Sequence, residues 1–436
     1  MTISGGMNQY LPYVERLEQL VASFRSGGEW MNEASLALNG QPSRELRHSV
    51  CLATLRSEGT FFTGTRLANQ LVGTSRSSKR RQSVYFDPTC GAGDLLLAAA
   101  RRLPIKHTLN DTLAYWGESL AGMDIHAEFI RATRARIAIL AISRGAKPDL
   151  RHQLNLEEIL PMIRVGDALT DCSFYATADR VLLNPPYCMT AAPTDCTWAT
   201  GMVTAAALFV EKAIKEARMG SVLSAILPDV LRSGSRYQAW RETIRDQASI
   251  DRVLVCGLFS TSADVDVFML DLNKSKTTPH KPWPRANRAI QSSTGFVGTF
   301  FDIHVGPIVP HRHRQKGPEH PYLHARNLPR WCSFAPGSER RRFEGRTFMP
   351  PFVVVRRTSR PGDPKRATAT IIRGKQAMAI ENHLLVFTPH DGKLKTCRAL
   401  MKRLYSKMTD KWLNRRIRCR HLTVKALAEL PWWRKA

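Results

Sequence analysis

Residues 181–190, VLLNPPYCMT, place four side chains with chemical potential directly after an apolar strand. Pro185 and Pro186 explain why the strand stops, because proline cannot donate to a strand ladder. They do not explain why Asn184 and Tyr187 flank them. An amine on an aromatic base poses a problem that these types could solve, since its lone pair is delocalised into the ring. Two hydrogen-bond acceptors on the amine hydrogens would free that lone pair for attack.

The four NPPY residues could supply both acceptors and a platform for the base. The side-chain oxygen of Asn184 is one acceptor, and the Pro185 carbonyl is the other, fixed because Pro186 restricts the backbone. Tyr187 would stack on the base through its ring. If the methyl donor is a sulfonium, attack yields a neutral thioether, so the site needs alignment and exclusion of water rather than a strong base. A base in a duplex must be flipped out to enter such a pocket. A strand-ending turn with a packed tyrosine is the alternative interpretation.

A glycine-containing turn forms a second candidate site, in the sequence VYFDPTCGAGDLLLAAA. Asp87 and Pro88 end a predicted strand, Gly91 and Gly93 occupy the turn, and a helix follows directly. Glycine permits close backbone approach, and a helix N-terminus offers unpaired N–H groups to a ligand. A single GxG pattern suits a structural turn equally well. Leu96 stands where the dinucleotide fingerprint requires a third glycine, which excludes NAD.

Acidic residues also end the next two predicted strands, at Asp124 and Asp167. Open α/β sheets bind ligands at the carboxyl ends of their strands, so three acids at successive strand ends predict one shared site. Asp124 could accept both hydroxyls of a ribose, and Asp167 could meet an adenine amino group. Each acid taken alone would also suit a helix cap or a turn.

The elements that must position these residues follow from hydrophobic periodicity. Continuous apolar runs alternate with helical patterns from about residue 84 to 274, which predicts an α/β fold with a mostly parallel, seven-stranded sheet covered on both faces. We therefore predict a helical N-terminal segment at 1–57, an α/β domain at 58–275, a linker at 276–292 and a basic α+β domain at 293–436.

Charge is distributed unevenly between these parts. The chain has a net charge of +27, and residues 275–436 hold 34 Lys and Arg against 9 Asp and Glu, whereas the remainder holds 30 against 28. A near-neutral body joined to a strongly basic module favours nucleic acid as partner. A solvated basic surface that maintains solubility is the alternative.

Composition excludes several other classes. The hydrophobic content of 43% predicts a globular protein, no apolar run is long enough to span a bilayer, and the opening MTISGGMNQY does not resemble a signal peptide. The nine cysteines form no CxxC pair. We therefore expect neither a metal site nor a disulfide framework, and a reducing cytoplasm. Cys90 and Cys188 flank the two motifs, and we expect them to be packing residues rather than nucleophiles.

The motifs together resemble a known family. NPPY after an apolar strand, with DPTCGAGDLL 97 residues earlier, is similar to the S-adenosylmethionine-dependent amino-methyltransferases, and in particular to the N6-adenine DNA methyltransferases of restriction-modification systems. Residues 58–72, EGTFFTGTRLANQLV, resemble the family's FFTP motif, although Gly64 replaces its usual proline. The resemblance covers about residues 58–275.

This resemblance implies a Rossmann-like methyltransferase domain, S-adenosyl-L-methionine as cofactor, and a target-recognition-like domain at 293–436. It implies site-specific methylation of adenine N6 in duplex DNA by a prokaryotic, cytoplasmic enzyme with no membrane association, and a possible separate restriction or specificity subunit. The implied cofactor-binding residues are Phe62, Thr63, Asp87, Pro88, Gly91, Gly93, Asp124, Ile125 and Asp167, where Thr63 and the glycine turn hold the methionine part. The implied catalytic residues are Asn184, Pro185, Pro186 and Tyr187.

Two other functions are compatible with the same residues. Release-factor glutamine methyltransferases share NPPY, because an amide nitrogen poses the same electronic problem, so an RNA adenine or a protein glutamine could be the substrate. A DNA-binding protein with a decayed methyltransferase site is the other alternative. The intact set of Asp87, Asp124, Asn184 and Tyr187 argues against decay.

Overall fold

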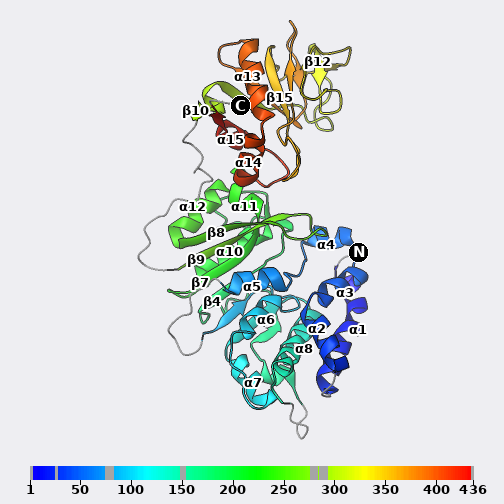
Figure 1. Ribbon diagram of the computed structural model, residues 1–436, viewed down its shortest axis with the longest axis vertical. Coiled ribbons are helices and arrows are strands. Elements are labelled where there is room, and N and C mark those ends of the chain that lie inside the picture. The colour runs from blue at the N-terminus through cyan, green and yellow to red at the C-terminus, as the bar shows by residue number, and fades with distance from the viewer. Residues whose placement is uncertain are drawn as a thin grey trace. The chain divides into compact units, whose positions relative to one another are not determined.

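The computed structural model describes residues 3–24, 28–73, 83–147, 154–274, 283 and 293–433, and Figure 1 shows its helices and strands. The chain divides into two compact units. The first comprises Met1–Leu231 and Gln238–Trp283, and the second comprises Arg232–Tyr237 and Pro284–Ala436. Apart from Trp283, the linker predicted at residues 276–292 lies outside the described residues.

The first unit contains a seven-stranded sheet in the order β3-β2-β1-β4-β7-β9-β8. The strands from β3 to β7 pair in parallel, whereas β9 pairs antiparallel with both β7 and β8. The predicted α/β class is therefore confirmed, and the sheet is mixed. The strands are β1 (Tyr85–Asp87), β2 (Leu120–Asp124), β3 (Ile163–Val165), β4 (Arg180–Leu183), β7 (Val222–Pro228), β8 (Ser249–Leu258) and β9 (Asp266–Asn273).

Burial of both faces explains why the central strands have unbroken apolar sequences. Every residue of β1 and β4 is buried, and only terminal residues of β7 and β9 are partly exposed. Helix α6 packs against β1 and β2, α8 against β2 and β3, and α10 against β4 and β7. The helices of this part are α6 (Asp94–Ala100), α7 (Leu109–Gly117), α8 (Ala127–Ser143), α9 (Leu156–Ile159), α10 (Ala205–Glu216), α11 (Asp229–Ser233) and α12 (Gln238–Gln247).

Two local features near the strand ends differ from the sequence pattern. The apolar run at 163–169 stops being a strand at Val165, because Asp167 begins a turn in which its Oδ1 accepts the Leu169 N–H at 2.9 Å. After the NPPY residues the chain forms a short antiparallel hairpin of β5 (Met189–Ala191) and β6 (Met202–Thr204), which the sequence did not indicate.

Helices occupy the described N-terminal part, as predicted. Gly40, at φ +83°, separates the second helix from the third, where the glycine and Pro42 signalled a break. The first two helices pack on α8, and this cover explains why α8 is buried almost throughout. These helices are α1 (Ile3–Ala22), α2 (Gly28–Leu38), α3 (Gln41–Ser49), α4 (Leu52–Glu58) and α5 (Thr65–Gly73).

The second unit contains a five-stranded sheet in the order β11-β18-β15-β16-β13, a three-stranded sheet β14-β12-β17 and the pair β10-β19. Its apolar core lies between the larger sheet and its helices. The strands are β10 (Ser293–Phe296), β11 (Phe301–Val305), β12 (Glu319–Leu323), β13 (Ser333–Phe334), β14 (Arg340–Arg342), β15 (Phe352–Arg356), β16 (Ala369–Ile372), β17 (Ala379–Ile380), β18 (Leu384–Pro389) and β19 (Pro431–Trp433). The helices are α13 (Leu394–Leu404), α14 (Lys407–Arg416) and α15 (Val424–Ala428).

Candidate active site

A cavity of about 230 Å³ lies at the carboxyl ends of β1, β2, β3 and β4. The rule that places ligands at this edge of an open sheet therefore holds for the first unit. The residues that line the cavity are Glu58, Gly59, Thr60, Phe61, Phe62, Pro88, Thr89, Gly91, Asp124, Ile125, His126, Phe129, Gly166, Asp167, Ala168, Asn184, Pro186, Cys188 and Phe209.

The glycine turn between β1 and α6 is closely packed on two sides. Gly91 and Gly93 have φ of +51° and +86°, which other residues rarely adopt. A Cβ on Gly91 would lie 2.9 Å from the Phe62 ring, and one on Gly93 would lie 2.8 Å from the Thr133 side chain. Thr133 Oγ1 also donates to the Gly91 carbonyl at 2.8 Å. Both glycines are therefore required by backbone conformation and by space.

Asp124 joins this turn to the end of β2. Its Oδ2 accepts the Gly91 N–H at 3.0 Å, and its Oδ1 accepts the His126 N–H at 3.0 Å. Burial raises the pKa of the Asp124 carboxyl, and the two N–H donors oppose that rise. Burial also raises the pKa of Asp87 well above its ordinary value, and the nearby Asp124 carboxylate raises it further. Asp87 Oδ1 accepts the Thr89 N–H at 3.1 Å, so it supports the turn from below.

The NPPY residues lie at the other side of the cavity. Asn184 Nδ2 donates to Thr63 Oγ1 at 2.9 Å and to the Phe61 carbonyl at 3.3 Å. Asn184 Oδ1 accepts the Tyr187 hydroxyl at 2.8 Å, and that hydroxyl also lies 3.2 Å from the Ile226 carbonyl. Asn184 therefore has its amide nitrogen fully engaged by the protein.

Tyr187 packs into the protein rather than along the cavity. It is missing from the described lining residues, and its ring makes an edge contact with Phe259 at a centroid distance of 6.0 Å. Burial raises the pKa of its hydroxyl well above the ordinary value. In this state Tyr187 fits the packed-tyrosine interpretation, and its stacking on a base stays a prediction that requires the side chain to turn.

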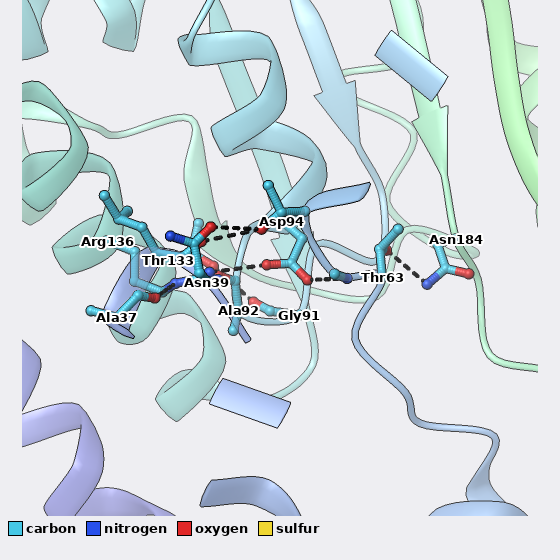
Figure 2. Close-up of polar contacts among 12 residues, drawn as sticks. Ala37, Asn39, Thr63, Gly91, Ala92, Asp94, Thr133, Arg136 and Asn184 are labelled. Carbon is cyan, nitrogen blue, oxygen red and sulfur yellow. Dashed lines mark hydrogen bonds and ion pairs between the residues drawn. The ribbon is translucent and has the colours of Figure 1, made fainter. Parts of the chain in front are cut away.

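Thr63 contacts Asn184, where the resemblance placed it on the methionine part of the cofactor. It, too, is missing from the described lining residues. The next residue, Gly64, has φ +72°, and its N–H donates to Asp94 Oδ2 at 2.6 Å. The family's usual proline has no N–H and a φ near −65°, so it could not form this contact. Figure 2 shows Asp94 between this loop and Arg136, whose Nη2 lies 3.0 Å from Asp94 Oδ1.

The remaining predicted cofactor residues line the cavity or lie beside it. Phe62, Pro88, Ile125 and Asp167 are lining residues, and the Ile125 side chain is unusually open for an apolar residue, at 64% exposure. Pro185 is buried behind the lining, whereas Pro186 faces the cavity.

Several lining residues were not identified from the sequence. Phe209 projects from α10, where it reads as an ordinary core residue. Gly59, at φ +68°, lies so close to the NPPY backbone that a Cβ would be 2.4 Å from the nitrogens of Tyr187 and Cys188. A glycine just before the FFTG motif was a signal for such an approach, but its partners are far away in sequence.

The described residues hold no group of three or more His, Cys, Asp or Glu that could bind a metal ion. No described helix is both long and apolar enough to cross a membrane. Cys90 and Cys188 are free thiols, and burial raises the pKa of each. A protonated, buried thiol suits packing rather than nucleophilic attack, in line with the sequence-based expectation.

The fold and the cavity define the class of S-adenosylmethionine-dependent methyltransferases. Residues 50–287, more than half of the chain, match the family model of the N-6 DNA methylases, and the chain belongs to this family. S-adenosylmethionine is accordingly its cofactor. The search of curated protein sequences found no match.

Solved structures share the fold at low sequence identity. The type IIL restriction-modification enzyme MmeI, solved with DNA, has 9% identity over 89% of this chain and 70% of its own, with a TM-score of 0.51. A class I methyltransferase from Listeria monocytogenes has 16% identity over 65% of this chain and 87% of its own, with a TM-score of 0.41. The type IIG endonuclease BpuSI has 14% identity, and the chain spans 61% of its length, with a TM-score of 0.43.

The geometry of the cavity fits this cofactor. The exposed side chain of Ile125 offers an apolar surface for an adenine ring beside Asp124, whose oxygens keep lone pairs for hydroxyl groups. At Gly91 the main chain comes to the cavity wall with no side chain in the way. Carboxylate acceptors, a glycine turn and apolar walls are the donor set that a nucleoside with an amino-acid tail requires.

Proposed function

We propose that the chain is a site-specific DNA adenine-N6 methyltransferase that acts on an adenine flipped out of duplex DNA, in a restriction-modification or related defence system. One observation carries this proposal most directly. Asn184 lines the same cavity as Asp124 and Asp167, so the base-activating amide and the nucleoside-binding acids share one site. Family membership supports adenine N6 as the target.

The chain's own residues have separable tasks in this proposal. Phe62, Pro88 and the main chain at Gly91 hold the methionine part, together with the buried Asp87 and with Gly93. Asp124 accepts the ribose hydroxyls, while Ile125 and Asp167 contact the adenine ring and its amino group. When bound, the cofactor supplies a methyl group on a sulfonium, which becomes a neutral thioether when the methyl leaves.

The NPPY residues act on the target amine. Asn184 Oδ1 accepts one N6 hydrogen, and the Pro185 carbonyl, fixed by Pro186, accepts the other. The incoming amine takes the place of the Tyr187 hydroxyl on Asn184 Oδ1. Tyr187 then turns from the packed position to stack on the base, and the apolar walls exclude water.

The second unit is proposed to contact DNA through a small arginine-rich sheet. Arg340 and Arg342 on β14 are exposed, whereas the intervening Arg341 folds back and donates to the His313 carbonyl at 2.7 Å. Its guanidinium also lies over the Tyr322 ring, 5.3 Å from the centroid. Arg341 thereby fixes a loop against the sheet, and this loop carries the exposed side chains of Arg312, Arg314 and Lys316. Clustered exposed cations suit a phosphate backbone.

Transfer of a tritiated methyl group to unmethylated genomic DNAs tests the proposal. Incorporation into duplex DNA, mapped to N6-methyladenine by long-read sequencing, is the expected result. No incorporation into any of several DNAs, while cofactor binding stays intact, would contradict it. Preferential labelling of RNA, or of a protein glutamine, would instead support the second substrate class. A search for co-purifying restriction or specificity subunits addresses the proposed partners.

A further inference from the structure

We propose that Thr63 is a positioning residue that fixes the side-chain amide of Asn184 in the one orientation that the reaction can use. The inference rests on the proposed function, because it concerns the residue that accepts the target amine. It departs from the family resemblance, which assigns Thr63 to the cofactor. The starting observation is the 2.9 Å contact between Thr63 Oγ1 and Asn184 Nδ2.

An asparagine amide has two chemically opposite ends, and only its oxygen can accept a hydrogen from an amine. The Asn184 NH₂ group has two hydrogens, and two acceptors face it: Thr63 Oγ1 at 2.9 Å and the Phe61 carbonyl at 3.3 Å. A carbonyl cannot donate, so rotation of the amide by 180° would place two oxygens against each other. The oxygen of Asn184 is therefore directed to the end where the Tyr187 hydroxyl now donates.

Thr63 is itself anchored by contacts that extend into the N-terminal helices. The adjacent Gly64 donates to Asp94, which pairs with Arg136. The Arg136 side chain is fully buried and also donates to the carbonyls of Ala92 in the glycine turn and Ala37 in α2. Figure 2 shows this path from Ala37 to Asn184. The Thr63 hydroxyl thus has a fixed position against which the amide can be aligned.

Loss of the hydroxyl should affect the chemical step rather than cofactor binding. In a Thr63→Val variant one amide hydrogen loses its acceptor, so the amide samples other orientations and the oxygen is aligned only part of the time. Misplacement of this kind costs about 10- to 100-fold in rate. A cofactor contact would instead show as a weaker dissociation constant for S-adenosylmethionine, with kcat unchanged at saturation.

The experiment compares three variants of the full chain. Thr63→Val removes the hydroxyl at constant shape, and Thr63→Ser keeps a hydroxyl. Thr65→Val makes the same change two residues away, where the hydroxyl faces Asn39 Oδ1 at 3.2 Å instead of Asn184. The measurements are kcat for methyl transfer at saturating cofactor and DNA, and the cofactor dissociation constant by calorimetry.

The expected result is a 10- to 100-fold lower kcat in Thr63→Val with cofactor affinity within about twofold of the native value. Thr63→Ser should recover most of the rate, and Thr65→Val should match the native protein. A native kcat in Thr63→Val, or a loss confined to cofactor affinity, would overturn the inference. A loss that Thr63→Ser does not recover would do the same.

A second measurement does not depend on methyl transfer. In protein labelled with ¹⁵N-asparagine, the Asn184 side-chain signal is assigned by its loss in Asn184→Ala. Its NH₂ hydrogens should exchange slowly with solvent in the native protein and in Thr63→Ser, and much faster in Thr63→Val. Equal exchange in all of them would refute the positioning role even in an active enzyme. If slow exchange is seen but no DNA is methylated, the proposed function fails while the positioning of Asn184 stands.

Discussion

The carboxylate of Asp124 accepts the main-chain N–H of Gly91 at 3.0 Å, which joins the end of one strand to the glycine turn after its neighbour. The same carboxylate accepts the His126 N–H, so both oxygens already support the main chain around the cavity. Asp124 therefore shapes the binding site and, in our proposal, also binds the ribose.

Replacement of Asp124 by Asn should weaken cofactor binding by about 10- to 100-fold, the equivalent of losing one or two charge-assisted hydrogen bonds. The amide can accept only one of the two N–H groups, and its own NH₂ faces the other. Calorimetry with S-adenosylmethionine measures the effect. Asp111→Asn, on the exposed start of α7, is the control and should bind normally. Native affinity in Asp124→Asn would contradict the assignment.

Removal of the Asn184 side chain should abolish most catalysis without loss of the cofactor. Asn184→Ala loses one of two acceptors for the amine, and loss of one such preorganised group costs about 100- to 1,000-fold in kcat. Methyl incorporation and calorimetry separate the two effects. Asn155→Ala, which removes an exposed cap of α9, serves as the control. Parallel loss of cofactor affinity and of the fold would indicate a structural role instead.

Substitution of Gly59 should displace the NPPY backbone. A Cβ there would lie 2.4 Å from two main-chain nitrogens, so Gly59→Ala should cost about 1–3 kcal/mol of stability and lower activity further than stability alone explains. Gly40→Ala separates crowding from backbone strain, because Gly40 also has positive φ but has open space around it. We expect about 1 kcal/mol for that control and native activity. Chemical denaturation and kcat provide the comparison.

Arg136 should contribute far more to stability than another arginine of the same helix. Arg136→Met leaves Asp94 without its buried partner, and breaking such a pair costs about 3–5 kcal/mol. Arg131→Met breaks an exposed pair with Glu18 and should cost about 0–1 kcal/mol. Urea unfolding of both variants tests the difference. Equal midpoints would show that the buried pair contributes no more than the exposed one.

The exposed arginines of β14 should determine part of the salt dependence of DNA binding. Arg342→Ala should reduce the slope of log affinity against log salt by about one, because one phosphate is then no longer neutralised by the protein. Arg398→Ala, on the exposed side of α13, is the control within the same unit. Fluorescence titrations at several salt concentrations measure the slope. Identical slopes for the native protein and Arg342→Ala would exclude a phosphate contact by this side chain.

Much of the site was predictable because it depends on local sequence and on one topological rule. Acids at successive strand ends had to meet at one edge once the sheet was parallel, and Asp124 and Asp167 do line one cavity. The contact between Thr63 and Asn184 was not predictable, because it joins loops 121 residues apart. The packing of Tyr187 depends similarly on Phe259 and on the end of β7.

The hydrogen bond from the Tyr187 hydroxyl to Asn184 Oδ1 bears on how many methyl groups one adenine can receive. An unmethylated amine has two hydrogens and can satisfy two acceptors, whereas the methylated product retains a single hydrogen. In the proposed reaction the phenol then competes for the vacated acceptor, returns to it and expels the product. The same contact would thereby promote turnover and restrict the outcome to monomethylation.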